Sequence, residues 1–225
     1  MRERLSIVIP VLNEGAGIVE MLAALVPLRT AGAEVIVADG GSTDATVQLA
    51  TAFADQIVLA PRGRARQMNT GAGGAHGDVL LFLHADTRLP ADALVNLEAA
   101  LDDGAQWGRF DVLISGRHTM LRVVAALINL RSRLSGIATG DQAIFVRRAA
   151  FDEVGGFADY PLMEDLALSD ALRKRWKPAC LKAKVTTSGR RWEQHGVWRT
   201  IVLMWTLRSA YRLGVSPKVL ARHYR

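Results

Sequence analysis

Short apolar runs alternate with stretches of helical periodicity through the first hundred residues of this 225-residue chain. Strands are predicted over four such runs: residues 5–10, 34–41 with its turn, 56–60 and 78–86. Helices are predicted between them: residues 18–28, residues 42–54 with Ser42 or Thr43 as N-cap, and a third helix starting near Pro90. Strands that alternate with helices across short connections are typical of a parallel sheet. Near-continuous apolar strands indicate that helices cover both of its faces.

The second half of the chain is less regular. Its periodicity predicts helices over residues 120–134, 163–175 and 197–213 and a strand over residues 142–148, while residues 64–74 fit either a Gly-bounded helix or a loop. No repeat, linker or low-complexity tract interrupts the pattern. We therefore expect a single α/β domain over residues 1–225, with a mostly parallel central sheet flanked by helices and a helical, basic C-terminal lobe.

Basic residues gather at the C-terminal end. Residues 173–225 hold 14 of the 28 Lys and Arg residues but only one of the 22 acids, Glu193. This asymmetry indicates an anionic partner, either phosphate, nucleic acid or a membrane surface, with a solvated basic face as the plain alternative. No nucleic-acid-binding motif accompanies the charge, so no nucleic acid partner is expected. The helix expected over residues 197–213 carries Trp and Arg as interfacial helices do, which favours peripheral membrane contact as much as packing on a core.

The sequence also bears on the compartment. A single cysteine, Cys180, excludes an internal disulfide and favours a reducing environment. Pro10 breaks the short apolar run behind the basic start and no small-residue cleavage site follows, so no signal peptide is expected. The longest C-terminal apolar run, residues 201–207, is far shorter than the ~20 residues that span a bilayer. We expect a cytoplasmic protein, located at the inner face of the membrane if the basic helix binds lipid.

Polar residues follow each predicted strand of the first half. In open α/β sheets, ligands bind beyond the carboxyl ends of the strands. The residues expected to line one crevice there are Asn13, Glu14, Asp39, Gly40, Gly41, Arg62, Arg64, Arg66, His84 and Asp86.

His84, Ala85 and Asp86 follow the most apolar strand. A carboxylate at this point can hold Mg²⁺ or Mn²⁺ while the metal keeps waters and binds diphosphate oxygens. An imidazole ligand from His84 would favour Mn²⁺. The alternative is that Asp86 caps the turn that leads to Pro90.

Two further segments suit phosphate. Glycines in residues 38–46 allow a ligand to approach the backbone, and the helix start behind them offers N–H groups to an anion. Residues 61–74 place three arginines and Gln67 among glycines, but they lack the G-K-[ST] of a Walker loop. The alternatives are an ordinary strand–turn–helix and a basic surface loop.

Glu164 and Asp165 stand at a predicted helix start. Neighbouring carboxylates raise each other's pKa and supply a candidate general base, while a helix cap is the alternative. Further on, RRWEQHG (190–196) gathers Arg191, Trp192 and His195, a cluster that favours binding of phosphate or of an acceptor.

Four segments in order, IVIPVLNE (7–14), VIVADGGSTDAT (35–46), GDVLLFLHADT (77–87) and GGF…MED (155–165), resemble the family 2 glycosyltransferases, which have the GT-A fold. The resemblance implies a hexosyltransferase-type enzyme that takes a sugar from a nucleotide-diphosphate sugar, uses Mn²⁺ or Mg²⁺ and inverts the anomeric carbon. It also implies a nucleotide-binding half, residues 1–110, and an acceptor-side half, residues 111–225. RRWEQHGVWRT (190–200) further resembles a subfamily linked to arsenosugar biosynthesis.

By position, the resemblance and the strand ends together imply a donor pocket made of Pro10, Leu12, Asn13, Glu14, Asp39, Gly40, Gly41, Arg64, Arg66, Gln67 and Ala85. Asp86 would hold the metal, with His84 and His195 as further candidate ligands. Asp165 would act as catalytic base with Glu164 beside it. Arg191 and Trp192 would contact the diphosphate or the acceptor.

Two positions depart from the family pattern. Gly40 stands where an aspartate that reads a uracil base is usual, which argues against UDP as the donor nucleotide. His84 stands where the metal motif D-x-D has its first aspartate, so this position either loses a carboxylate ligand or supplies an imidazole.

Two other classes of function compete with glycosyl transfer. A sugar-phosphate nucleotidyltransferase would need a basic, Gly-rich triphosphate loop near the N-terminus, and LNEGAG (12–17) contains no Lys or Arg. A non-enzymatic module would bind anions or membranes through the basic tail alone. For a transferase, the acceptor is expected to be a lipid or a small molecule.

Overall fold

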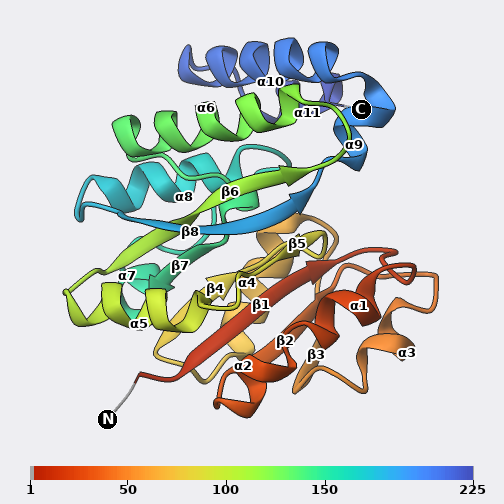
Figure 1. The fold of residues 1–225 in the computed structure, drawn as a ribbon, viewed down its shortest axis with the longest axis vertical. Coiled ribbons are helices and arrows are strands. Elements are labelled where there is room, and N and C mark those ends of the chain that lie inside the picture. Colours follow the sequence, from red (N-terminus) through yellow and green to blue (C-terminus); the bar gives the residue numbers. More distant parts are fainter. Residues whose placement is uncertain (1–2, 225) are drawn as a thin grey trace.

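The structure, a computed structural model, describes residues 3–224. Its centre is one eight-stranded sheet in the order β3-β2-β1-β4-β7-β6-β8-β5 (Figure 1). The strands are β1 (Leu5–Val11), β2 (Glu34–Asp39), β3 (Gln56–Leu59), β4 (Val79–Phe82), β5 (Thr87–Arg88), β6 (Trp107–Ser115), β7 (Ile144–Arg147) and β8 (Ala179–Ser188). Four of the seven pairings are parallel, which confirms the predicted mostly parallel sheet.

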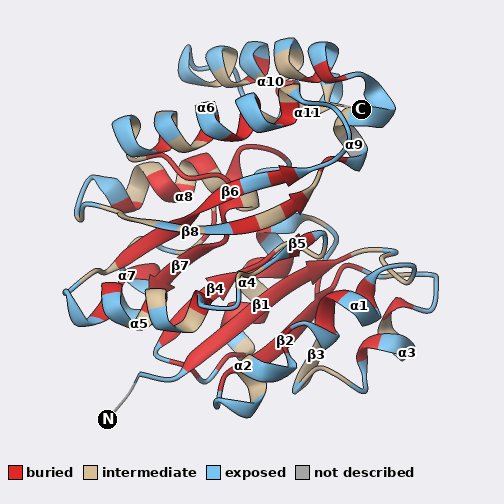
Figure 2. Cartoon of the chain, viewed as in Figure 1, coloured by how far each residue is buried: buried red, intermediate tan, exposed pale blue. Residues whose placement is uncertain are grey.

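Helices cover both faces of this sheet, as predicted. On β1, Ile7 and Ile9 belong to the core that includes α1 (Ile18–Ala23), α5 (Ala93–Asp102) and α6 (Met120–Ser135). Val8 points the other way, into the core formed with α4 (Arg64–Gly74), α7 (Arg148–Glu153) and α8 (Glu164–Arg173). Strands β1, β2 and β4 are therefore buried along their whole length (Figure 2), and this is why they stand out in the sequence as continuous apolar runs.

The C-terminal lobe consists of α9 (Arg190–His195), α10 (Val197–Arg212) and α11 (Pro217–His223). Helix α10 confirms the helix predicted over residues 197–213. It runs beside α6 (Figure 1). Leu207 of α10 and Leu220 of α11 join a small core with Leu162, Met163 and Leu166. The lobe is thereby packed against the first turn of α8. No helix within residues 3–224 is both long enough and apolar enough to cross a membrane.

The helix predicted over residues 18–28 is wrong in one respect, because the structure divides it into α1 and α2 (Val26–Thr30). Pro27 lacks an N–H group and cannot continue the hydrogen-bond ladder of α1, although it suits the first turn of α2. The helix expected from Pro90 likewise begins later, at Ala93, with Asp92 in the N-cap position.

The helix predicted over residues 42–54 is much shorter, since only α3 (Thr46–Ala50) is helical. Ser42 and Thr43 do not cap it. Ser42 donates to the Asp39 carboxylate and the Thr43 N–H donates to Asn13 Oδ1, so both residues brace the loop in front of the helix. The backbone and hydroxyl of Thr46 instead donate to Asp44.

Residues 64–74, left open between helix and loop, form α4 despite three glycines. A Cβ on Gly71 would lie 2.4 Å from Cγ1 of Val8, so the absence of a side chain lets α4 pack directly on β1. This close packing sets the position of α4 along β1, and so places Arg64, the first residue of α4, beside the strand ends.

Strands β6 and β8 escaped prediction. The β6 sequence contains Arg109 and Asp111, which break its apolar run, yet both are buried, and Arg109 has no exposed surface. They pair with each other, and Asp111 also accepts from Arg133 of α6 at 2.6 Å. A buried charge that is paired and hydrogen-bonded is tolerated inside a sheet. In the sequence, however, such charged residues interrupt the apolar pattern by which a core strand is recognised.

Candidate active site

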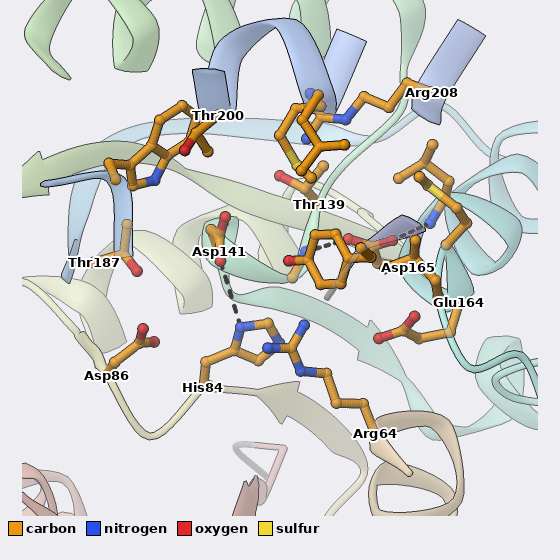
Figure 3. Close-up of a pocket in the computed structure, with 18 of the residues that line it drawn as sticks. Arg64, His84, Asp86, Thr139, Asp141, Glu164, Asp165, Thr187, Thr200 and Arg208 are labelled. Atoms are coloured by element: carbon orange, nitrogen blue, oxygen red, sulfur yellow. Dashed lines mark hydrogen bonds and ion pairs between the residues drawn. The ribbon is translucent and has the colours of Figure 1, made fainter. Parts of the chain in front are cut away.

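Two adjoining hollows lie at the carboxyl ends of β1 and β4. The outer cleft, about 310 Å³, is lined by Pro10, Val11, Leu12, Glu14, Arg62, Gly63, Arg64, Gln67, His84, Ala85 and Asp86. The inner cavity, about 180 Å³, lies between the strand ends and the C-terminal lobe. Arg64, His84 and Asp86 line both, and Figure 3 shows these three side chains at the inner cavity. A ligand that passes them can occupy both hollows.

The outer cleft brings together most of the residues predicted to bind a nucleotide. Pro10, Leu12, Glu14, Arg64, Gln67 and Ala85 all line it. Burial raises the pKa of Glu14, and the like charge of Asp86 adds to this, against the opposing charges of Arg190 and Arg64. Carboxylates and arginines therefore face one another at its edge, a mixed arrangement that suits a ligand carrying both polar groups and phosphate.

Gly40 is packed against Gln67 beneath this cleft. A Cβ on Gly40 would meet the Gln67 amide carbon and nitrogen at 3.0 Å. The amide itself is fixed, since Gln67 Nε2 donates to the carbonyl oxygens of Val11 at 2.7 Å and Ala38 at 3.0 Å. The glycine that departs from the family pattern thus has a structural partner, and an aspartate there would require Gln67 to move.

Asn13, Asp39 and Gly41 lie behind the cleft and do not appear among the residues that line either hollow. The buried Asp39 carboxylate accepts from the N–H groups of Gly41 and Ser42. Asn13 donates its N–H to Ser42 Oγ at 2.9 Å with a positive φ of 56°. Asn13 thereby joins the loops after β1 and β2, and Asp39 braces the second of these loops, so the two residues support the position of Leu12 and Glu14. Arg66 points elsewhere and pairs with exposed Asp159.

His84 is held against the short 3₁₀ helix η1 (Gly140–Gln142). Its Nδ1 lies 3.5 Å from Asp141 Oδ1, the contact drawn in Figure 3. A Cβ on Gly140 would stand 2.4 Å from the imidazole Cε1, so only glycine lets the ring lie this close. Burial tends to raise the pKa of Asp141, but the hydrogen bond and charge of His84, with Arg64 and Arg208, hold that pKa below its ordinary value.

Glu164 and Asp165 face the inner cavity from the start of α8 (Figure 3). Glu164 is 5% exposed, and burial, followed by the charge of Asp165, raises its pKa to about 7. Asp165 accepts the Gly140 N–H on Oδ2 and the Leu166 N–H on Oδ1, both at 2.8 Å. Desolvation acts to lower the pKa of Arg64, but nearby carboxylates, Glu164 first, outweigh it and raise that pKa. A carboxylate that ionises near neutral pH can act as a general base.

Backbone strain gathers around the same hollows. Among residues 3–224, the non-glycine residues with positive φ are Asn13, Ala143 and Met163. Each stands next to a residue or segment of the site: Glu14, η1 and Glu164 respectively. Strained backbone of this kind persists where surrounding structure enforces it, and it concentrates at functional sites.

Within residues 3–224, no group of three or more His, Cys, Asp and Glu side chains is placed to hold a metal ion. Asp86 is exposed at the border of the two hollows, with His84 beside it. Mg²⁺ and similar ions need only one or two protein carboxylates when substrate phosphates and waters complete the shell. The residues therefore fit a metal shared with a bound diphosphate, with Asp86 as the carboxylate, and not a site built by protein alone.

The C-terminal lobe closes the inner cavity from above. Trp192 and His195 of α9 line it, and Arg199, Thr200 and Arg208 of α10 join them, while the acceptor or phosphate role of the α9 cluster stays a prediction. The predicted contribution of Arg191 falls on a side chain outside those the structure describes.

Several cavity residues were missed in the sequence, above all Thr139, Asp141 and Arg208. Thr139 and Gln142 form a capping box, and the spacing T-x-x-Q is its signature, so η1 had a detectable signal. Nothing in the sequence near Asp141, however, links it to His84, which lies 57 positions earlier.

Comparison with known proteins agrees with this geometry. The family model described as "Glycosyl transferase family 2" matches residues 6–155, which include both strand ends, α4 and η1. An uncharacterized glycosyltransferase of Mycobacterium bovis is 32% identical over 126 residues, which are 56% of this chain and 52% of that protein. A PGL/p-HBAD biosynthesis glycosyltransferase of Mycobacterium tuberculosis is 31% identical over 160 residues, 68% of this chain and 62% of that protein. The chain thus spans about half to three fifths of these relatives.

Solved structures share the fold. The mannosyltransferase PcManGT of Pyrobaculum calidifontis, in complex with GDP-Man and Mn²⁺, matches 97% of this chain and 67% of its own with a TM-score of 0.69 and 20% identity. TarS of S. aureus, residues 1–349, covers 83% of this chain and 60% of its own, with a TM-score of 0.66 and 19% identity. These similarities establish the GT-A architecture.

Proposed function

The chain belongs to glycosyl transferase family 2, and from this premise we propose that it transfers a sugar from a nucleotide-diphosphate sugar to an acceptor hydroxyl with inversion at the anomeric carbon. The observation that carries the proposal is the pair of hollows joined at Arg64, His84 and Asp86. A nucleotide in the outer cleft would lay its diphosphate across these three residues and its sugar toward Glu164 and Asp165.

The donor would be held by complementary charge. Arg64 supplies a guanidinium to the diphosphate, and Asp86 supplies a carboxylate for Mn²⁺ or Mg²⁺. The bound metal would neutralise charge on the departing diphosphate. Two solved structures that share the fold hold Mn²⁺, PcManGT together with GDP-Man and glucosyl-3-phosphoglycerate synthase of Mycobacterium tuberculosis together with UDP and glucosyl-3-phosphoglycerate, which supports a metal here. Gly40 stands at the position of the base-reading aspartate, so other groups of the outer cleft would select the base. Gln67, which packs against Gly40 and lines the cleft, is one of them.

The transfer would be a single displacement. The acceptor oxygen forms the new bond to the anomeric carbon from the face opposite the diphosphate, whose bond to that carbon breaks with both electrons. The acceptor proton passes to Asp165, which the Gly140 and Leu166 N–H groups hold in a fixed orientation. Glu164, with a pKa of about 7, would share the charge of the protonated pair. Arg64 stabilises the leaving nucleoside diphosphate.

The test is a thermal-shift screen of nucleotide sugars with and without Mn²⁺, followed by the configuration of the product by NMR. Ligands that bind the native state raise its apparent stability. We expect at least one nucleotide sugar to stabilise the protein in a Mn²⁺-dependent manner, and the anomeric configuration of the product to be opposite to that of the donor. Stabilisation by a nucleoside triphosphate with pyrophosphate release would favour the nucleotidyltransferase alternative instead.

Two predictions remain attached to this function. The similarity of residues 190–200 to the arsenosugar-linked subfamily remains a prediction about the pathway, since the relatives described above carry other names. The cytoplasmic location, at the inner face of the membrane, likewise remains a prediction. Both depend on what the acceptor is, which the C-terminal lobe bears on directly.

A further inference from the structure

An apolar groove of about 650 Å³ runs between α6 and α10. Apolar side chains of both helices form its walls, among them Leu127, Ile128, Leu134, Trp198, Ile201 and Trp205. Figure 2 shows the outer sides of both helices largely exposed. Leu134 is 80% exposed, and Trp198 and Trp205 are 62% and 64% exposed. A contiguous apolar surface of this extent marks a binding site for an apolar partner.

Charge around the groove is mostly positive, although Asp141 is among the residues that line it. Helices α6, α10 and α11 contain no Asp or Glu, whereas they contain eight Lys and Arg residues: Arg122, Arg131, Arg133, Arg199, Arg208, Arg212, Lys218 and Arg222. A second copy of this chain is a poor occupant, because a two-fold contact would set these like charges against each other. An amphiphile with an anionic head is complementary to both the apolar walls and the charge.

Arg131 provides the second observation. Among the described residues, its Nε and Nη2 atoms are buried and have no hydrogen-bond partner. Burial, followed by the positive charge of Arg208, lowers its pKa to about 10, against the opposing charge of Asp165. Two buried guanidinium nitrogens without partners are costly unless a ligand completes their hydrogen bonds. Two more arginines, Arg208 and Arg212, line the groove and add positive charge near Arg131, so a ligand that completes the site would be an anion.

The groove also leads to the inner cavity. Asp141, Trp192, Met204 and Arg208 line both spaces. A ligand head bound at Arg131 and Arg208 therefore lies next to the cavity that contains Asp165. A flat membrane surface could cover the outer faces of α6 and α10, but it could not reach the buried Nε and Nη2 atoms of Arg131 in the groove.

We propose that this groove binds the acceptor, and that the acceptor is a lipid with a phosphate-bearing head. Its hydrocarbon chain lies between α6 and α10, and its phosphate binds Arg131, Arg208 and Arg212. The inference rests on the proposed glycosyl transfer for its catalytic step. In that step a head-group hydroxyl oxygen bonds to the anomeric carbon, its proton passes to Asp165, and the nucleoside diphosphate leaves with the electron pair.

Binding can be measured without catalysis by quenching of tryptophan fluorescence. The probe is 11-bromoundecyl phosphate below its micellar concentration, since bromine on the chain quenches tryptophans that it contacts. Trp192, Trp198 and Trp205 line the groove, while buried Trp107 and half-buried Trp176 belong to or pack on another core and provide the unquenched remainder. We expect saturable quenching by the phosphate, and none from 11-bromoundecanol at the same concentration.

Matched variants on α6 separate the groove from general charge. Arg131→Met should weaken binding about tenfold or more, the scale of a lost charge-assisted contact, without lowering thermal stability, because it removes two buried nitrogens that lack partners. Arg122→Met changes an exposed arginine of the same helix outside the groove and should leave binding unchanged. Leu127→Ser should weaken binding of the probe, because it removes an apolar contact with the hydrocarbon chain. Val95→Ser, at an exposed position on α5, should leave binding unchanged.

Three outcomes would overturn the proposal. Equal binding of the bromo-alcohol would remove the role of phosphate, and equal loss in Arg131→Met and Arg122→Met would reduce the effect to net charge. Binding to phosphatidylglycerol vesicles without binding of the monomeric probe would assign the face to the membrane surface. Failure of the proposed function is distinguishable, because nucleotide-sugar binding is measured separately and does not involve the groove.

Discussion

His84 and Asp141 connect the end of β4 to η1 through the 3.5 Å approach of Nδ1 to Oδ1. This pair ties the border of the two hollows to the backbone that also holds Asp165, because the Gly140 N–H donates to the Asp165 carboxylate. The residue that departs most from the family's metal motif is thereby part of the framework that sets the position of Asp165, the proposed base.

Asp141→Asn tests this framework. The substitution removes the charge that orients the imidazole, and we expect the rate of sugar transfer to fall about tenfold while the melting temperature changes little. Asp159→Asn is the matched control, since it breaks the exposed pair with Arg66 outside both hollows and should be nearly silent. Equal rates in the wild type and Asp141→Asn would show that the contact has no role in positioning.

Asp86→Ala tests the shared metal. With the one carboxylate at the border removed, the additional thermal stabilisation that Mn²⁺ gives in the presence of a nucleotide sugar should disappear. Asp92→Ala changes an exposed acid at the start of α5 and should retain that stabilisation. Retention of the full metal effect in Asp86→Ala would place the metal elsewhere.

Glu164→Gln tests the buried carboxyl through stability. Folded Glu164 keeps its proton up to a pKa of about 7, whereas the unfolded chain releases it near 4.5. Between these values the native state binds more protons, so the free energy of unfolding falls as pH rises, by about 3 kcal/mol in total. The variant should lose most of that decline in urea titrations between pH 5 and pH 8. Glu20→Gln, exposed and paired with Arg88, should keep it. A decline as steep in Glu164→Gln as in the wild type would refute the assignment.

Asp165→Asn separates catalysis from binding. We expect the donor affinity to stay within about twofold and transfer to fall by about 10²-fold or more, the scale of a general acid–base group. Single-turnover kinetics with saturating donor measure this directly. If Asp165→Asn transfers normally and Glu164→Gln does not, the proton passes to Glu164.

Prediction from sequence succeeded for strands that are buried on both faces of the sheet and therefore consist of one continuous apolar run. Strands β1 and β4 are continuous apolar runs, so their ends, and with them Glu14, His84 and Asp86, could be placed on one edge of the sheet. Strand β6 could not be found this way, because the buried Arg109–Asp111 pair disguises a core strand as a polar one.

The inner cavity was beyond local patterns for a different reason. Its assembly depends on contacts between distant segments, such as His84 with Asp141 and the packing of Leu207 and Leu220 on the start of α8. The hydrogen bonds between Asn13 and the loop after β2 also come from such contacts, while Asp39 accepts from Gly41 and Ser42 within that loop. They make these two residues supports for the loops after β1 and β2, a role that their place at strand ends does not reveal.

The central claim is that one nucleotide-diphosphate sugar spans both hollows past Arg64. Isothermal titration of nucleotide sugars with Mn²⁺, against the wild type and Arg64→Ala, tests it most directly. The account predicts that at least one nucleotide sugar binds the wild type and that its affinity falls about tenfold or more in Arg64→Ala, because a charge-assisted contact with the diphosphate is lost. Absence of binding to the wild type, or equal affinity in the variant, would contradict it.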